Sequence, residues 1–137
     1  MMKKVLFFFC LIMFLNSKAQ NVSALRSQQN SPDGWVLLKN TANIQFSVKE
    51  IACNGNSIFL VKIENTDTAA VSAKWSFWKM GDTEPTQELF RKYTVEAKSK
   101  VEGECPDAST MTVFRPLFHY LYDGATINDL VFKLTIN

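Results

Sequence analysis

The side chains that could support catalysis are few and widely spaced in this chain of 137 residues. His119 is the only histidine, and it lies in the aromatic run Phe118–Tyr122, where strand alternation predicts a place on a strand surface. No Gly-x-Ser-x-Gly turn accompanies it, so the sequence predicts no nucleophile with a general base beside it. Zinc needs several His or Cys ligands at set spacing. We therefore expect no metal site and no cofactor.

Two pairs of carboxylates are spaced by two residues, Asp82 with Glu84 and Glu102 with Glu104. Glycoside hydrolysis uses two carboxyl groups across the scissile bond. However, a spacing of two on a strand places both side chains on one face, which is ordinary for an edge in contact with water. No acidic loop has the spacing of a calcium site. A small carboxylate-dependent hydrolase is therefore the least favoured functional hypothesis.

Trp78 is the strongest candidate for a binding residue. It alternates onto the same predicted strand face as Lys74 and Ser76, and an exposed aromatic side chain can stack on a sugar ring or anchor a protein partner. The opposing interpretation is that the edge of the fold covers this ring and makes it structural. We take Trp78, Lys74, Ser76 and the neighbouring loop residues Asp82 and Glu84 as the candidate binding site.

The first nineteen residues have the features of a secretory signal peptide. Two lysines precede the apolar run Val5–Leu15, and Ser17 and Ala19 supply the small side chains that a signal peptidase accepts. The apolar run is too short for the roughly twenty residues of a transmembrane helix. We expect cleavage before Gln20, no membrane span afterwards, and a bacterial protein that is secreted or held in the periplasm or cell envelope.

Signal cleavage changes the charge balance of the chain. The full sequence has 15 basic and 13 acidic residues and a net charge of +2, and loss of three lysines at positions 3, 4 and 18 leaves −1. This removes the excess of positive charge that nucleic-acid binding would use. The remaining 118 residues are one domain by length, large enough to bury a core without a metal.

Cysteine usage agrees with export. Cys10 leaves with the signal peptide, so Cys53 and Cys105 remain as a single pair. In an oxidising compartment such a pair usually forms a disulfide, and both cysteines lie beside turn residues that could bring strand ends together. The alternative is two independent buried thiols. We predict the disulfide.

The rest of the chain has the pattern of an all-β domain. Residues 20–34 are polar and end in the breaker Ser-Pro-Asp-Gly, which predicts a flexible leader. From Trp35 onward short alternating runs follow one another, and no helical period is sustained over ten residues. Residues 87–90 fit either a helical turn or an edge strand. The predicted strands are 35–39, 44–53, 57–64, 71–78, 93–97, 101–105, 111–122 and 130–136.

This strand series, the cysteine pair and an inward Trp75 resemble bacterial immunoglobulin-like or fibronectin-type sandwiches over residues 35–137. The resemblance implies two antiparallel sheets with seven or eight strands. Trp75 lies twenty-two residues after Cys53, and Cys105 precedes the strand that begins at Met111. Because this departs from the antibody pattern, we do not expect its disulfide between the sheets.

The resulting prediction is an exported immunoglobulin-like β-sandwich that binds a protein or a glycan and is not an enzyme. A domain of this kind presents loops and strand edges to its partners. The main alternative is a structural subunit of the cell envelope that assembles through exposed sheet edges. The oligomeric state is open at this stage.

Overall fold

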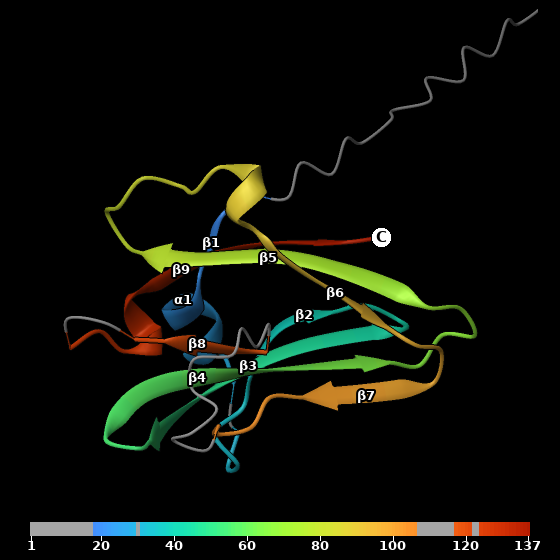
Figure 1. The fold of residues 1–137 in the computed structure, drawn as a ribbon, viewed down its shortest axis with the longest axis horizontal. Coiled ribbons are helices and arrows are strands. Elements are labelled where there is room, and N and C mark those ends of the chain that lie inside the picture. Colours follow the sequence, from blue (N-terminus) through green and yellow to red (C-terminus); the bar gives the residue numbers. More distant parts are fainter. Residues whose placement is uncertain (1–17, 30, 107–116, 122–123) are drawn as a thin grey trace, which may run out of the picture.

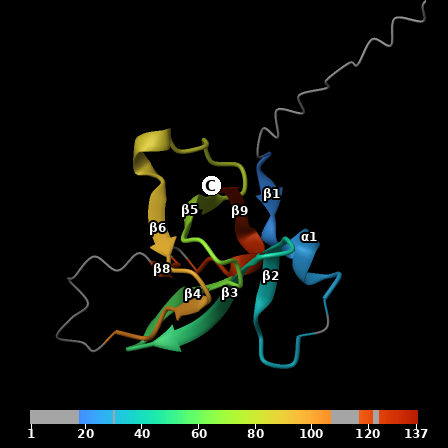
Figure 2. The same cartoon turned by 90° about the vertical axis from the view of Figure 1, so that its right-hand side faces the viewer.

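The computed structural model describes residues 18–29, 31–106, 117–121 and 124–137. The predicted signal peptide lies almost wholly outside these residues, as does most of the predicted strand 111–122. The described chain forms two antiparallel sheets that pack face to face (Figure 1 and Figure 2). This confirms the all-β, two-sheet sandwich predicted from the alternating runs.

The first sheet has the strand order β1-β9-β5-β6, and the second has the order β2-β3-β4-β7, with β8 also paired to β4. The strands of the first sheet are β1 (Gln20–Asn21), β5 (Val71–Lys79), β6 (Arg91–Val95) and β9 (Leu130–Ile136). Those of the second sheet are β2 (Val36–Asn40), β3 (Ile44–Cys53), β4 (Asn56–Asn65), β7 (Ser99–Glu102) and β8 (Phe118–Tyr120). One α-helix, α1 (Val22–Arg26), and 3-10 turns at Gln87–Leu89 and Ile127–Asp129 complete the described elements.

The long hairpin β3–β4 follows directly from the sequence. Its two strands pair over ten residues each, from Ile44 with Asn65 to Cys53 with Asn56. Asn54 and Gly55 form the turn with φ of 49° and 80°, which is the left-handed backbone that an Asn-Gly hairpin turn requires. The turn signal and the alternation of both strands therefore predicted this element correctly.

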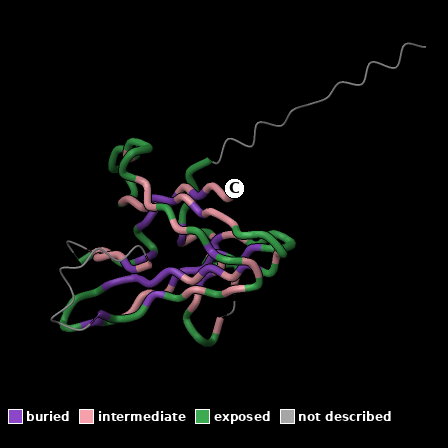
Figure 3. Tube along the Cα trace, turned by 45° about the vertical axis from the view of Figure 1, so that its right-hand side comes forward, coloured by how far each residue is buried: buried purple, intermediate pink, exposed green. Residues whose placement is uncertain are grey.

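The main core lies between the two sheets, where inward residues of both sheets meet (Figure 3). Trp75 is fully buried at its centre, and its ring meets the edge of Phe46 with ring centroids 5.3 Å apart. The inward face of β4 contributes Phe59, Val61 and Ile63, as its alternation predicted. The sandwich is thus held by aromatic and β-branched side chains from strands far apart in sequence.

The segment predicted as a flexible leader is partly built into the fold. Gln20 and Asn21 pair with β9 as β1, and α1 follows at once. Val22 is fully buried in the main core, and Leu25 packs against that core one helical turn later. Two apolar residues spaced by three lie on one face of a helix. Their burial stabilises an ordered helix here, although the polar composition of the segment predicted a flexible one.

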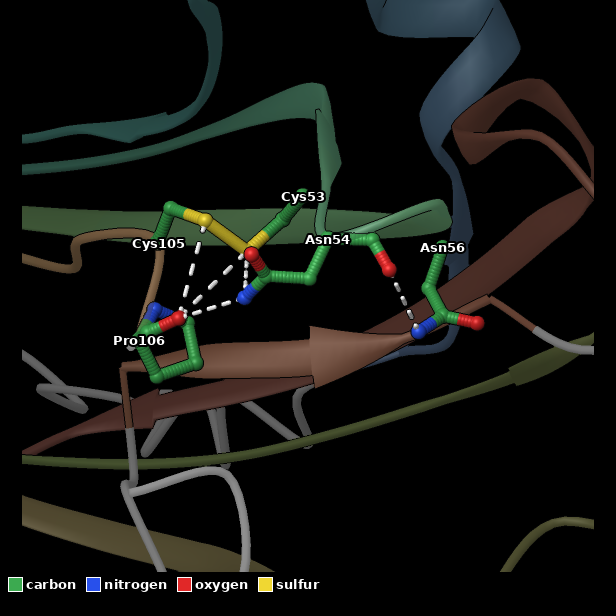
Figure 4. The surroundings of a disulfide bond; sticks show 5 residues. All are labelled: Cys53, Asn54, Asn56, Cys105 and Pro106. Carbon is green, nitrogen blue, oxygen red and sulfur yellow. Dashed lines mark hydrogen bonds between the residues drawn. A yellow bond between two sulfur atoms is a disulfide. The ribbon is translucent and has the colours of Figure 1, made fainter. Parts of the chain in front are cut away.

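The disulfide between Cys53 and Cys105 is present, with Cα atoms 5.7 Å apart (Figure 4). It joins the tip of the β3–β4 hairpin to the segment that follows β7. Asn54 reinforces this link because its Nδ2 donates a hydrogen bond to the carbonyl oxygen of Pro106 at 2.7 Å. Both cysteines belong to the same layer, so the bond does not join the two sheets.

A second, smaller hydrophobic cluster lies on the outer face of the second sheet. Ile58 and Leu60 alternate with the inward residues of β4 and are buried there with Phe118 and Cys53. Tyr120 packs partly against this cluster, as expected for a tyrosine that shares a strand face with Phe118. Both faces of this sheet are therefore apolar where β8 pairs with β4.

Two strands, β7 and β8, pair one after the other with the edge of β4 that faces away from β3, and the boundary between them is at Val61. Glu102 of β7 pairs with Lys62, and Phe118 of β8 pairs with Leu60. Between them Val61 accepts a hydrogen bond from the N–H of Gly103 at 2.9 Å and donates one to the carbonyl of Leu117 at 2.8 Å. The edge strand thus leaves β4 at Gly103 and returns at Leu117.

Replacing Gly103 by alanine is expected to destabilise this junction. A Cβ at Gly103 would lie 2.2 Å from the carbonyl oxygen of Leu117, so the backbone has to move. We expect Gly103→Ala to lower the free energy of unfolding by about 1–3 kcal/mol, as for other overpacked sites. Urea unfolding checks this, with Lys100→Ala on exposed β7 as a control that changes stability by less than about 0.5 kcal/mol. Equal stability of the two variants would contradict the predicted clash.

Candidate functional site

The described parts of the two layers leave an opening beside the end of β5. β6 pairs with β5 only from Val71 to Trp75, so the last four residues of β5 have no strand on that side within the described chain. A cavity of about 410 Å³ opens there, between this free edge and β8. We call it the β5-edge cavity. Its lining residues are Phe59, Phe77, Trp78, Lys79, Asp82, Arg91, His119, Tyr120, Leu121, Ala125 and Leu130.

His119 points into the space between the sheets and not to the surface. It pairs with Phe59 across β8 and β4, and the two rings stack with centroids 4.5 Å apart and planes 3° from parallel. The edge of Phe77 approaches the same imidazole at 5.3 Å. The expectation of an ordinary strand-surface histidine is therefore wrong. Phe118 occupies the outer cluster, so its neighbour on a strand faces the opposite way.

The hydrogen bond from Trp75 determines the tautomer of His119. The indole Nε1–H donates to Nε2 at 3.0 Å, so Nε2 is the acceptor and a neutral ring carries its proton on Nδ1. No buried side-chain nitrogen or oxygen of the described residues lacks a partner. Since no described residue pairs with Nδ1, this N–H reaches accessible space, and His119 lines the cavity. It is available as a hydrogen-bond donor to a ligand there.

The environment of His119 favours the neutral imidazole. Burial among aromatic rings, and secondarily the positive charge of Arg91, lower the pKa of His119 well below its ordinary value of about 6.5. Arg91 itself is held nearby because its Nη1 donates to the carbonyl of Phe118. The ring is thus an uncharged donor at neutral pH.

This pKa shift predicts a loss of stability in mild acid. Below pH 6.5 the unfolded chain takes up a proton at His119 that the folded chain does not, so stability is complete above pH 6.5 and falls as the pH drops toward the folded pKa. The limiting slope is about 1.4 kcal/mol per pH unit. Urea unfolding between pH 7.5 and pH 5 measures it, and His119→Gln should flatten it. If the unfolding free energy of His119→Gln depends on pH as steeply as that of the wild type, other groups cause the loss of stability in acid.

Two of the five predicted binding residues line the cavity. Trp78 is half-buried and forms part of its wall, and Asp82 follows in the loop after β5. Lys74 lies away from it, with its Nζ 5.8 Å from the ring centroid of Phe90. The described structure thus joins Trp78 and Asp82 in one place and leaves Lys74 on the outer face of the first sheet.

The other two residues lie where a loop covers the first sheet, Glu84 in the loop and Ser76 on β5 beneath it. Figure 1 shows this loop, between β5 and β6, arching over β5 on the side away from the second sheet. Glu84 holds it to β9 through an ion pair with Lys133 at 2.8 Å. Ser76 is buried and lines a smaller cavity of about 230 Å³ with Pro85 and Leu89. Phe77, Arg91 and His119 line both cavities, so the two adjoin.

The described residues of the cavity provide recognition groups, and the structure places Asp82 and Glu84, one of the two carboxylate pairs weighed in the sequence, in different surroundings. Asp82 lines the cavity, whereas Glu84 is paired with Lys133 on the outer face. Among the residues that the structure describes, no group of three or more His, Cys, Asp or Glu is placed to hold a metal ion. His119, Arg91 and Phe77 are among the cavity residues that the sequence did not predict. Strand alternation between Phe118 and His119 was the available signal for the first of them.

No helix within the described ranges is both long enough and apolar enough to cross a membrane. Comparison with known proteins finds no protein family, no curated protein and no solved structure that matches this chain.

Proposed function

We propose that this chain is an exported, non-catalytic binding module that holds a protein or glycan partner at the β5-edge cavity. Export is supported by the signal-peptide features of the first nineteen residues and by the disulfide, since disulfides persist in oxidising compartments. The periplasm, the cell surface and the medium of a bacterium are all consistent with this. The observation that carries the proposal is the open cavity beside Trp78.

Several features of the cavity support recognition. Ligand sites combine apolar and aromatic walls with a few polar groups, and here Phe77, Trp78 and Tyr120 adjoin Asp82 and His119. The volume of about 410 Å³ is within the range of small-ligand sites. Trp78 also comes from a rigid strand, which keeps the entropy cost of ordering a binding surface low.

Capture of a partner from the cell envelope and culture medium tests the proposal. The chain from Gln20 to Asn137 contains every described strand and helix, so it is the form to immobilise. We expect specific capture of a protein or glycan that Trp78→Ala weakens by roughly tenfold, about the effect of losing a hot-spot side chain. The matched control is Lys92→Ala on exposed β6, which should retain capture. Equal capture by wild type and Trp78→Ala would remove the cavity from the proposal.

A second candidate function is a self-assembling structural subunit, and the free edge of β5 favours it. Ser72 and Asn137 exchange both backbone hydrogen bonds between β5 and β9. Successive residues of a strand direct their peptide N–H and C=O groups to opposite sides. Since those of Ser72 point to β9, those of Phe77, five residues later, point to the other side, which β6 does not cover there. Exposed strand edges pair with other chains. Concentration-dependent oligomers in sedimentation, abolished by Phe77→Pro, would support this function over the binding module.

A further inference from the structure

We infer that the β5-edge cavity recognises an acidic sugar, a six-membered ring that carries hydroxyl groups and one carboxylate. This assignment rests on the proposed binding function and names the ligand class of the same site. The charge of the lining, the hydrogen-bonding groups that face the cavity and its aromatic walls favour this ligand class.

The charge of the lining favours an anion. Lys79 and Arg91 line the cavity, and Asp82 is the one carboxylate among the lining residues that the structure describes. His119 adds no charge at neutral pH and adds an N–H donor through Nδ1, because Trp75 donates to Nε2. A carboxylate accepts such donors and is stabilised by both cations, whereas a cationic ligand would meet two like charges.

The number of polar groups favours a hydroxylated ring over a plain aromatic acid. Asp82 accepts hydrogen bonds, His119 donates one, and the part of the β5 edge that no described strand covers presents the peptide N–H and C=O of Phe77 beside them. Sugar hydroxyl groups both donate and accept, so they can pair with all of these groups. A benzoate would displace water from the same groups without replacing its hydrogen bonds, which weakens binding.

The aromatic walls and the volume set the size of the ligand. Phe77 and Trp78 line the cavity and provide apolar surface for the C–H face of a sugar ring. The cavity of about 410 Å³ lies near the lower end of the range for ligand sites, which suits one or two sugar rings. A longer glycan would extend out of the opening along the edge of β5.

The single histidine allows a direct test by NMR. In residues 20–137 labelled with ¹⁵N-histidine, His119 gives the only imidazole signals. We expect sodium D-glucuronate at pH 7.5 to shift these signals in a saturable way. D-glucose, which lacks the carboxylate, and benzoate, which lacks the hydroxyl groups, should each bind at least about tenfold more weakly, the effect of one lost charge-assisted contact.

Two lysine variants test the role of charge. Lys79→Gln removes a cation that lines the cavity, and we expect it to weaken glucuronate binding by roughly threefold to tenfold with little effect on glucose. Lys92→Gln removes an exposed cation of β6 outside the lining and should leave both affinities unchanged. If both variants lose the same affinity for glucuronate, the effect comes from the net charge of the protein and not from a contact in the cavity. That result would overturn the proposed site.

The outcomes separate this assignment from the proposed function. Absence of a saturable glucuronate shift, or equal binding of glucose or benzoate, overturns the acidic sugar. If Trp78-dependent capture from the envelope still occurs, the binding module stands without it. Conversely, glucuronate binding that Trp78→Ala weakens, together with no captured macromolecule, supports the ligand class and overturns the larger partner.

Discussion

The double variant Cys53→Ala/Cys105→Ala is expected to lose about 4 kcal/mol of unfolding free energy, the chain-entropy value for a closed loop of about fifty residues. The two cysteines are separated by 52 residues, and their bond restricts the unfolded chain across β4, β5, β6 and β7. Domains of this size have a total stability of about 5–15 kcal/mol. The variant should therefore be marginally stable, with a urea midpoint shifted strongly downward.

Chemical reduction supplies the control for this prediction. Wild-type protein in a reducing agent keeps both sulfur atoms but loses the bond, so its stability should fall to nearly that of the double variant. The side-chain hydrogen bond from Asn54 to Pro106 would still link the hairpin tip to the segment after β7. A loss below about 1 kcal/mol in both cases would mean that the unfolded chain is not restricted by this loop.

Trp75→Ala is expected to destabilise the fold by about 3–5 kcal/mol, the range for truncating a large aromatic side chain in a packed core. Trp75 is fully buried against Phe46, and it is also the hydrogen-bond donor to His119. Its loss opens a cavity between the sheets and leaves the imidazole acceptor without its partner. Urea unfolding at pH 7.5 measures the loss, provided that the slope of the transition stays unchanged.

Trp75→Phe separates packing from the hydrogen bond. It retains an aromatic ring in the core and removes the Nε1–H, so a smaller loss of about 1–3 kcal/mol is expected from the unpaired acceptor and the smaller ring. If Trp75→Phe is as stable as wild type, the bond to His119 contributes nothing net. If Trp75→Ala costs less than about 1 kcal/mol, Trp75 is not the centre of the core.

Much of the architecture could be predicted from the sequence because strand alternation is a local property. The inward faces of β3, β4, β5 and β9 each show it over several residues, and Asn54-Gly55 marks the hairpin turn. The disulfide was predicted by assigning Cys10 to the signal peptide, which leaves Cys53 and Cys105 as one pair, and from the turn residues beside both of them. These features could be predicted without knowing which segments pack against each strand.

Other features depended on contacts between distant segments. Asn65 ends β4 at a predicted polar loop, yet it is buried, and its Nδ2 donates to the carbonyls of Ala69, Val95 and Glu96 at 2.9–3.1 Å. A buried amide is stable there only because the crossing of the chain between sheets places those carbonyls around it. Composition indicated a loop residue, whereas the packing makes it a structural one.

The candidate site shows the same division. Trp78 and Asp82 lie within seven residues of the inward Trp75. The predicted strand and the loop after it were therefore enough to identify both as candidate binding residues. His119 and Arg91 reach the cavity from β8 and β6, which pair with different sheets. Their proximity follows from the start of β6 at Arg91, opposite Trp75, and from the return of the chain at Leu117.

The sequence by itself determined the strand series, the hairpin turn, the fold class and the disulfide partners, because each depends on local alternation, a local turn or the number of cysteines. Only the tertiary structure decided that His119 faces inward, that Val22 is buried and that the sandwich is open beside Phe77. The physical reason is that burial and hydrogen-bond partners are set by which surface lies opposite a residue, and here those surfaces come from segments far apart in the chain.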